Sequence, residues 1–234
     1  NRYPDEKVKE KKNSNINVLN NKNIFDAIVI GSGPGGSISS YYLNKKFKSK
    51  VLLLEQGGHY QNFKKKHPAN EFLRMWKNGG VNMTMFGKMI SYATGSCLGG
   101  GSEINSGLYH SPDKNFIERW KFDCEVDAID ETDLNNKFNE LKKICNVELN
   151  YNKTNIPNYS HFIKGAEINK FKIEELSSFH SFKAKNEIKK NSMSTTFIKK
   201  FIEEGGKYCC YVKAKKILKK EQYWEIVCNY KNKK

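Results

Sequence analysis

Apolar positions along the chain predict alternating strands and helices from residue 24 onward. The stretch 24–31, IFDAIVIG, is a short apolar run typical of a buried strand, and 50–55, KVLLLE, is a second one. Residues 34–47 lie between them with the spacing of a helix, whose predicted apolar side consists of Ile38, Tyr41, Tyr42 and Leu43. Because neither strand alternates strictly between apolar and polar residues, we predict an α/β fold with a parallel sheet covered on both faces.

The later part of the chain continues this mixture of helices and strands. A helix followed by an irregular segment is predicted within residues 70–91. Further helices are predicted at 115–120, 133–144, 160–171 and 195–204, the last ended by Gly205 and Gly206. Two late strands are predicted at 207–217 and 223–230, joined by a short polar turn.

Four glycines occupy six positions in the turn after the first strand, GSGPGG. The spacing is GxGxxG between a strand and a helix, which is the context of a dinucleotide-binding turn. Gly31 permits the tight turn, Gly33 lets the backbone approach a pyrophosphate, and Gly36 lets helix and strand come close. Pro34 and Gly35 open the helix, whose amino end attracts phosphate. We therefore predict a Rossmann-like domain in three layers.

An acidic residue follows at the spacing that this fold requires. Glu55 stands nineteen positions after Gly36, at the end of the second strand, where a carboxylate can accept both hydroxyl protons of an adenosine ribose. A carboxylate there disfavours the 2′-phosphate of NADP. The alternative is a glycine-rich turn in another α/β protein, with Glu55 as an exposed strand end. At this point the motif does not separate FAD from NAD.

A second glycine block favours FAD over NAD, because it resembles the signature of a known family. Residues 95–112, GSCLGGGSEINSGLYHSP, resemble the glycine-rich signature of the glucose-methanol-choline (GMC) family of FAD-dependent oxidoreductases, closest to its bacterial choline-dehydrogenase-like branch. Residues 55–58 (EQGG) and 191–217 also resemble that family, so the likeness runs from 25 to 217. Glycines in this block let backbone amides face a flat ring or a diphosphate. The block's predicted cofactor-binding residues are Gly99, Gly100 and Gly101.

The resemblance implies an oxidoreductase that acts on the CH–OH group of donors and passes hydride to FAD. It implies that Asn105 lies near the flavin ring and that the backbone at Val212 meets the adenine. Some members tether FAD through a histidine one residue before that asparagine; Ile104 stands there, so non-covalent FAD is expected. The implied partners are an alcohol and an electron acceptor, either oxygen or a quinone-like carrier. The alternative for the glycine block is a purely structural loop. The alternative for Asn105 is a turn-forming role.

The family's catalytic histidine lies near the carboxyl end of its members, and this chain has no match to it. We assign no catalytic residue, and expect the catalytic histidine beyond Lys234. The expected domains are a disordered basic arm at 1–23 and the amino-terminal portion of an FAD-binding domain at 24–234, incomplete relative to the family, with the substrate domain largely absent. The alternative function is a non-catalytic nucleotide-binding remnant.

Charge leaves one further alternative. The formal net charge is +16, and from residue 183 onward the chain has 15 Lys against five Glu. A nucleic acid or another anionic surface is the partner that such an excess attracts. No nucleic-acid-binding signature accompanies it, so no nucleic-acid partner is expected.

The six cysteines lack metal-ligand spacing, and neither a transmembrane segment nor a signal peptide is evident, which favours a cytoplasmic protein without a bound metal.

Overall fold

The computed structural model describes residues 23–47, 50–60, 68–124, 130–148, 159–173, 176–183 and 187–230. All but the last residue of the expected basic arm at 1–23 lies outside these ranges. Within the expected domain at 24–234, contacts group the chain into two compact units, residues 1–105 with 192–234 and residues 106–191. None of the described helices is long and apolar enough to cross a membrane.

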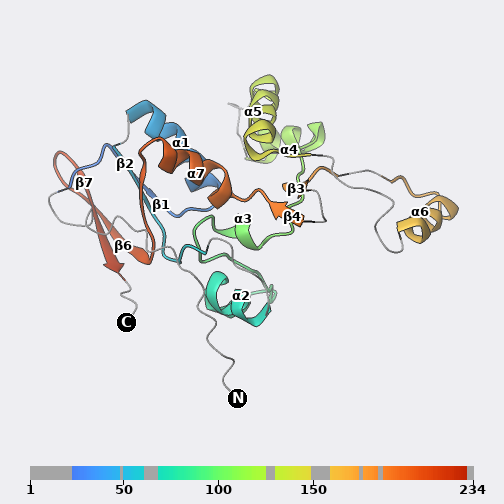
Figure 1. Cartoon of the computed structure of the whole chain (residues 1–234), viewed down its shortest axis with the longest axis horizontal. Coiled ribbons are helices and arrows are strands. Elements are labelled where there is room, and N and C mark those ends of the chain that lie inside the picture. Colours follow the sequence, from blue (N-terminus) through green and yellow to red (C-terminus); the bar gives the residue numbers. More distant parts are fainter. Residues whose placement is uncertain are drawn as a thin grey trace, which may run out of the picture. The chain divides into compact units, whose positions relative to one another are not determined.

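The first unit contains a parallel sheet, as predicted. Its strands are β1 (Ala27–Ile30), β2 (Val51–Leu54) and β5 (Lys207–Cys209), in the order β1-β2-β5. Figure 1 labels β1 and β2. Ala27 lies opposite Val51, and Leu52 lies opposite Lys207. All four residues of β2 are buried because the strand has a neighbour on each side. The three-layer arrangement stays a prediction.

Helix α1 (Pro34–Phe47) has the predicted bounds, but its buried side differs from the prediction. The helix packs against β1, β2 and α7 (Phe197–Glu203), and the Tyr41 ring meets the Phe197 ring edge-on at 5.5 Å. Tyr42 is exposed, whereas the buried residues of α1 are Ser37, Ser40, Tyr41 and Asn44. The small serines bring the helix backbone close, and their hydroxyls donate to the carbonyls of Ser32 and Gly36 at 2.6 and 2.7 Å.

The predicted strand at 207–217 is wrong as a single strand. The backbone of Tyr211 has a positive φ of 61°, which ends β5 and starts β6 (Val212–Lys219) in a new direction. Strand β6 pairs antiparallel with β7 (Trp224–Tyr230), in agreement with the predicted late pair. Val212 and the β2 residues Leu52 and Leu54 belong to one buried cluster, against which Ile226 of β7 packs.

Short helical elements connect the sheet to the glycine-rich loops of the first unit. After β2 come α2 (Pro68–Met75) and the 3-10 turn η2 (Lys77–Gly80), which confirm the predicted helix followed by an irregular segment. Helix α3 (Gly101–Ile104) follows the second glycine block, and η4 (Met193–Thr195) precedes α7.

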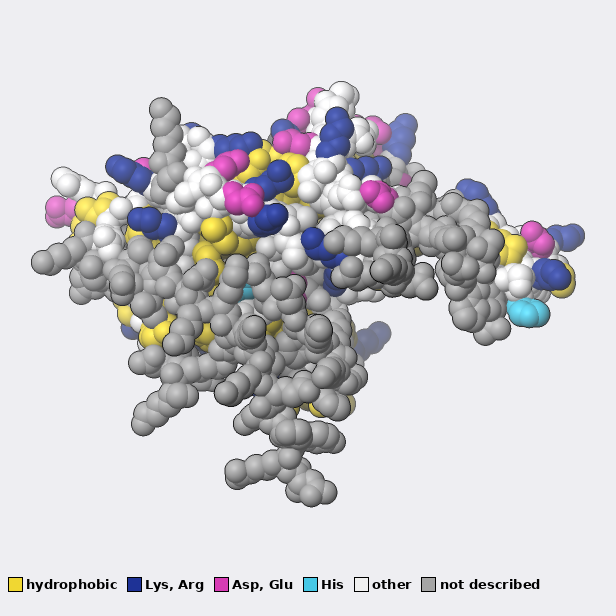
Figure 2. Space-filling view, viewed as in Figure 1, with side chains coloured by type: hydrophobic (Ala, Val, Ile, Leu, Met, Phe, Trp, Pro, Cys, Tyr) yellow, Lys and Arg dark blue, Asp and Glu magenta, His cyan; other side chains and the backbone are white. Residues whose placement is uncertain are grey.

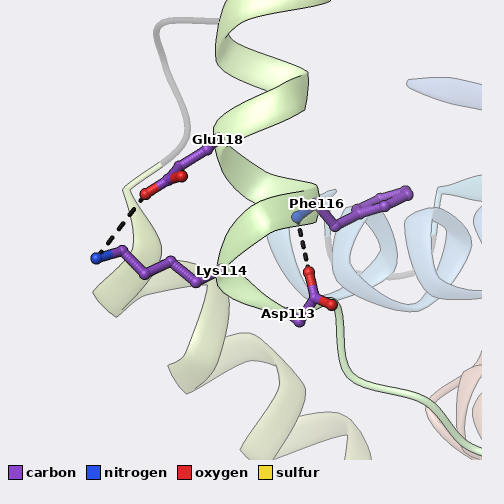
Figure 3. A network of polar contacts seen from close by, with 4 residues as sticks. All are labelled: Asp113, Lys114, Phe116 and Glu118. Atoms are coloured by element: carbon purple, nitrogen blue, oxygen red, sulfur yellow. Dashed lines mark hydrogen bonds and ion pairs between the residues drawn. The ribbon is translucent and has the colours of Figure 1, made fainter.

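The second unit contains the predicted helices with shifted ends. They are α4 (Lys114–Cys124), α5 (Glu131–Cys145) and α6 (Tyr159–Ile168). The Asp113 carboxylate accepts the Phe116 N–H at 2.7 Å, and Lys114 pairs with Glu118 at 3.8 Å, so side chains in its first turns stabilise α4 (Figure 3).

An antiparallel pair in the second unit was not predicted. Strands β3 (His180–Lys183) and β4 (Glu187–Lys190) pair with His180 opposite Lys190. Their sequence is rich in lysine and lacks a clear apolar alternation, so the pairing depends on tertiary contacts rather than on a local signal.

Candidate functional site

The first glycine turn has the geometry that its spacing predicts. The Gly31 backbone has a φ of 92°, and its N–H donates to the Leu54 carbonyl at 2.8 Å. The Ser37 N–H donates to the Gly33 carbonyl at 2.9 Å, which closes the first turn of α1. A Cβ at Gly36 would overlap the Gly31 carbonyl oxygen, so only glycine permits this close approach of helix and strand.

Glu55 is buried and binds the glycine turn directly. Its Oε2 accepts the Ser32 N–H at 3.0 Å and the Ser32 hydroxyl at 2.6 Å, and its Oε1 accepts the Gly57 N–H at 2.8 Å. Only 5 % of the residue is exposed. Each carboxylate oxygen can accept two hydrogen bonds, so these three leave acceptor capacity on Oε1. Contact of this carboxylate with a ribose stays a prediction.

The second glycine block packs on the first. The Gly99 N–H donates to the Ser32 hydroxyl oxygen at 3.0 Å. A Cβ at Gly100 would lie 2.7 Å from the Gly33 Cα, and both Gly99 and Gly100 have positive φ. Residues about seventy positions apart in the sequence therefore form one continuous backbone surface.

Ser32 joins these parts and was missed by the sequence analysis. It is fully buried, its hydroxyl donates to Glu55 and accepts from Gly99, and its carbonyl accepts the Ser37 hydroxyl at 2.6 Å. The available signal was its place between Gly31 and Gly33, where a small side chain with both a donor and an acceptor can link neighbouring loops.

Besides Gly31, three glycines of this surface have no atom where a side chain would point. A Cβ at Gly33, Gly35 or Gly101 would meet nothing within 4 Å, so the backbone there is open to a close-lying ligand. Pro34 begins α1, a helix of 14 residues whose positive dipole end lies at this turn. Such a surface suits the pyrophosphate of a dinucleotide.

The two remaining predicted residues lie at different points of the first unit. The Val212 N–H donates to the Glu55 carbonyl at 2.9 Å, and its side chain is buried in the cluster beside β2. Asn105 is exposed at the end of α3, where its N–H donates to the Gly101 carbonyl at 3.0 Å. The structure thus brings Val212 to Glu55 and places Asn105 one short helix away from the glycine block.

A groove opens beyond the carboxyl end of β2. It measures about 620 Å³, and Gln56, Gly57 and Gly58 form part of its wall. Basic side chains that also line it are Arg74, Lys77 and Lys213. Ligands of open α/β sheets bind at this end of the strands, and cations there favour an anionic ligand.

Burial suppresses the reactivity of the cysteines around this sheet. It raises the pKa of Cys209 to about 11, with a smaller contribution from Cys228. Burial, and then the negative charges of Glu103 for Cys97 and Glu55 for Cys210, raise the pKa values of those two thiols as well. All three side chains are buried, whereas Cys124 is exposed.

We expect a thiol reagent such as Ellman's reagent to modify Cys124 in the native protein and to spare Cys209 until unfolding. The thiolate is the reactive form, and at pH 9 a thiol of pKa 11 is only about 1 % ionised, so burial and the raised pKa both protect Cys209 in the folded protein. Peptide mapping after labelling measures this. Equal labelling of both residues at pH 7 in the folded protein would contradict the burial of Cys209.

The described residues show neither a metal cluster nor a single basic patch on the visible face. No group of three or more His, Cys, Asp or Glu among them is placed to hold a metal ion. Lys and Arg side chains are interspersed with Asp and Glu over the coloured part of Figure 2.

The five histidines of the chain include His59, which is buried. Its Nδ1 lies 3.1 Å from the Tyr208 hydroxyl, a structural contact.

Comparison with known families decides which fold family this is. The sequence model of the family described as GMC oxidoreductase matches residues 72–233, more than half of the chain. The chain belongs to the GMC oxidoreductase family. The resemblance seen in the second glycine block is thereby confirmed, and the matched domain is the FAD-binding domain of these oxidoreductases.

Two of three curated relatives carry the same family name, and the third is named as an alcohol oxidase. An uncharacterized GMC-type oxidoreductase of Sinorhizobium fredii is 30 % identical over 125 residues, which are 53 % of this chain and 25 % of that protein. A long-chain-alcohol oxidase of Arabidopsis thaliana is 34 % identical over 97 residues, 41 % of this chain and 13 % of that protein. A GMC-type oxidoreductase of Mycobacterium tuberculosis is 23 % identical over 124 residues, 52 % of this chain and 20 % of that protein.

The matches to this GMC oxidoreductase cover a quarter or less of the length of these relatives. Their names specify neither choline nor a choline-dehydrogenase-like branch, so that branch stays a prediction. The glycine turn at 31–36 lies before the matched residues 72–233, and the geometry described above connects it to the second glycine block.

Proposed function

We propose that this chain binds FAD non-covalently and belongs to an oxidoreductase that acts on the CH–OH group of an alcohol. One observation carries the proposal: the two glycine blocks form a single backbone surface, held by Ser32 and Glu55, that is open at Gly33, Gly35 and Gly101. A side chain at any of these three positions would occupy the space that a pyrophosphate needs.

The remaining residues suit the rest of the cofactor. Glu55 and the groove beyond it would take the adenosine half, with the Val212 backbone near the adenine, and Asn105 would lie toward the flavin. When bound, FAD supplies an acceptor for the hydride of the carbinol carbon. The residues of this chain named above would bind and orient FAD, and Ile104 offers no nucleophile to tether it.

FAD binding is tested by titrating the apoprotein with FAD and following the quenching of flavin fluorescence. We expect one FAD per chain, released completely into the supernatant on acid precipitation because no covalent bond holds it. Flavin retained in the pellet would contradict the non-covalent proposal, and failure to bind FAD while binding NAD would contradict the cofactor.

The reaction is tested with the whole polypeptide that carries this sequence. The alcohol oxidase relatives suggest a long-chain alcohol as substrate, and the sequence resemblance suggests choline. We expect anaerobic bleaching of the flavin absorbance near 450 nm by one of these alcohols, followed by reoxidation with oxygen or a quinone. FAD binding without reduction by any alcohol would favour the non-catalytic remnant.

A cytoplasmic location stays a prediction.

A further inference from the structure

Tyr211 has a backbone conformation that a tyrosine rarely adopts. Its φ of 61° lies in the left-handed region, where a Cβ raises the energy of the backbone. Among the described residues, the other non-glycine residues with positive φ are two asparagines and a lysine: Asn78, Asn146 and Lys170. Asparagine enters this region more readily because its short polar side chain can hydrogen-bond locally. A bulky aromatic residue held in this region points to a function for its side chain.

Backbone hydrogen bonds on both sides of the strained residue hold its conformation. The Tyr211 N–H donates to the Gly57 carbonyl at 3.0 Å, and the Val212 N–H donates to the Glu55 carbonyl at 2.9 Å. Both acceptors follow β2 directly, so the turn between β5 and β6 is paired with the end of that strand. Neither bond uses the Tyr211 side chain, so a replacement at this position leaves both in place.

The Tyr211 side chain lies on the groove and not in the core. Val212 is buried in the cluster beside β2, whereas its two neighbours, Tyr211 and Lys213, line the groove of about 620 Å³ and an adjoining one of about 330 Å³. A Cβ at Gly58 would overlap the Tyr211 hydroxyl oxygen, so the ring lies against the backbone that forms the groove wall.

A continuous path of contacts leads from the glycine turn to this ring. Ser32, next to Gly33, donates its N–H and its hydroxyl to the Glu55 carboxylate. The same carboxylate accepts the Gly57 N–H at 2.8 Å, and the Gly57 carbonyl accepts the Tyr211 N–H. A dinucleotide with its pyrophosphate at Gly33 and its ribose at Glu55 therefore has its base in the groove beside Tyr211, beyond the carboxyl end of β2.

We propose that the Tyr211 ring stacks on the adenine of the bound dinucleotide and makes a large contribution to its affinity. This assignment rests on the proposed function, because it requires a dinucleotide at the glycine turn. Stacking of a planar base on an aromatic ring is favourable, and it offsets the strain of the left-handed backbone at residue 211. Tyr211 contacts only the adenosine half and takes no part in hydride transfer.

The first test follows the affinity of the whole polypeptide for FAD and for ADP, which carries the adenosine half without the flavin. Tyr211→Gly should weaken the binding of both ligands by about tenfold or more, and by the same factor, because both have the adenine. Tyr211→Phe keeps the ring and should bind like the parent protein. The matched control is Tyr223→Gly, which removes a tyrosine that is 61 % exposed between β6 and β7 and should leave both affinities unchanged.

Thermal unfolding of the apoprotein separates stacking from folding. Tyr211→Gly loses the packing of the ring on Gly58, but glycine adopts a positive φ without strain, so Tm should change by less than about 4 °C. If this variant unfolds far below the parent, Tyr211→Trp decides instead. The emission of the introduced indole should be quenched by ADP, beyond the change that the parent shows with Trp76 in the same groove.

Each outcome has a definite meaning. FAD binding by the parent together with parent-like affinity of Tyr211→Gly overturns this assignment and leaves the proposed function intact. An indole emission in Tyr211→Trp that ADP does not change also overturns it, since another part of the protein would then cover the ring. A parent protein that binds neither FAD nor ADP would contradict the proposed function and this assignment together.

Discussion

Replacing Gly33 by valine is expected to abolish FAD uptake while the protein remains folded. A Cβ at this position meets no atom within 4 Å beyond its chain neighbours, so the added side chain points into the open space proposed for the pyrophosphate. FAD affinity should fall at least about a hundredfold. The fold should lose only about 1 kcal/mol, the cost of valine in place of glycine at the residue that precedes a helix.

Two measurements separate binding from folding. Flavin fluorescence titration gives the affinity, and thermal unfolding with and without FAD gives the stabilisation by ligand, which is about 2.7 kcal/mol at a hundredfold excess over Kd. The parent protein should gain this stabilisation, and Gly33→Val should not. Gly33→Val with the FAD content of the parent would show that the pyrophosphate lies elsewhere.

Gly36→Ala serves as the contrasting variant in the same turn. Its Cβ would overlap the Gly31 carbonyl oxygen, so helix α1 must move away from β1. The expected loss is about 3 kcal/mol or more in the free energy of unfolding, typical of overpacking against backbone. The two glycines thus separate the roles of the turn: Gly33 in ligand approach and Gly36 in packing.

Glu55→Gln is the second change with a large expected effect. The carboxylate accepts hydrogen bonds from Ser32 on one oxygen and from Gly57 on the other. A glutamine amide has only one oxygen, so in either orientation its NH₂ group faces a backbone N–H that loses its acceptor. We expect destabilisation of about 3 kcal/mol, or roughly 6–12 °C in Tm for a chain of this size.

The matched control for this variant is Glu118→Gln on α4. Glu118 is exposed and pairs with Lys114 at 3.8 Å, so the change should shift stability by less than about 0.5 kcal/mol. Thermal unfolding without FAD measures both variants. If Glu55→Gln unfolds at the same temperature as the parent protein, the hydrogen bonds of this carboxylate do not hold the two glycine blocks together.

Local sequence was sufficient for the features that depend on neighbouring residues alone. The apolar runs at 24–31 and 50–55 predicted β1 and β2, the GxGxxG spacing predicted the turn, and the helical spacing of apolar residues at 34–47 predicted α1. The second glycine block predicted the family, which the match to residues 72–233 confirms. Each signal lies within about twenty residues, where backbone conformation follows from residue type.

Tertiary structure decided the features that join distant segments. Ser32 has no motif of its own, and its role depends on Glu55 and Gly99 meeting at its hydroxyl. The division of the late strand at Tyr211 depends on a positive φ that a non-glycine residue rarely adopts, so the sequence predicted one continuous strand. The apolar side predicted for α1 was only partly right: Tyr41 is buried as predicted, Tyr42 is exposed, and the buried side also includes two serines, which allow the helix to lie close to its neighbours.

The sequence by itself therefore determined that this protein has a parallel sheet with a glycine-rich turn, and that it belongs to the GMC oxidoreductases. Only the tertiary structure decided that both glycine blocks form one surface and that Glu55 is buried within it. The physical reason is that spacing along a chain specifies local backbone geometry, whereas burial and hydrogen-bond partners depend on which distant segments pack together.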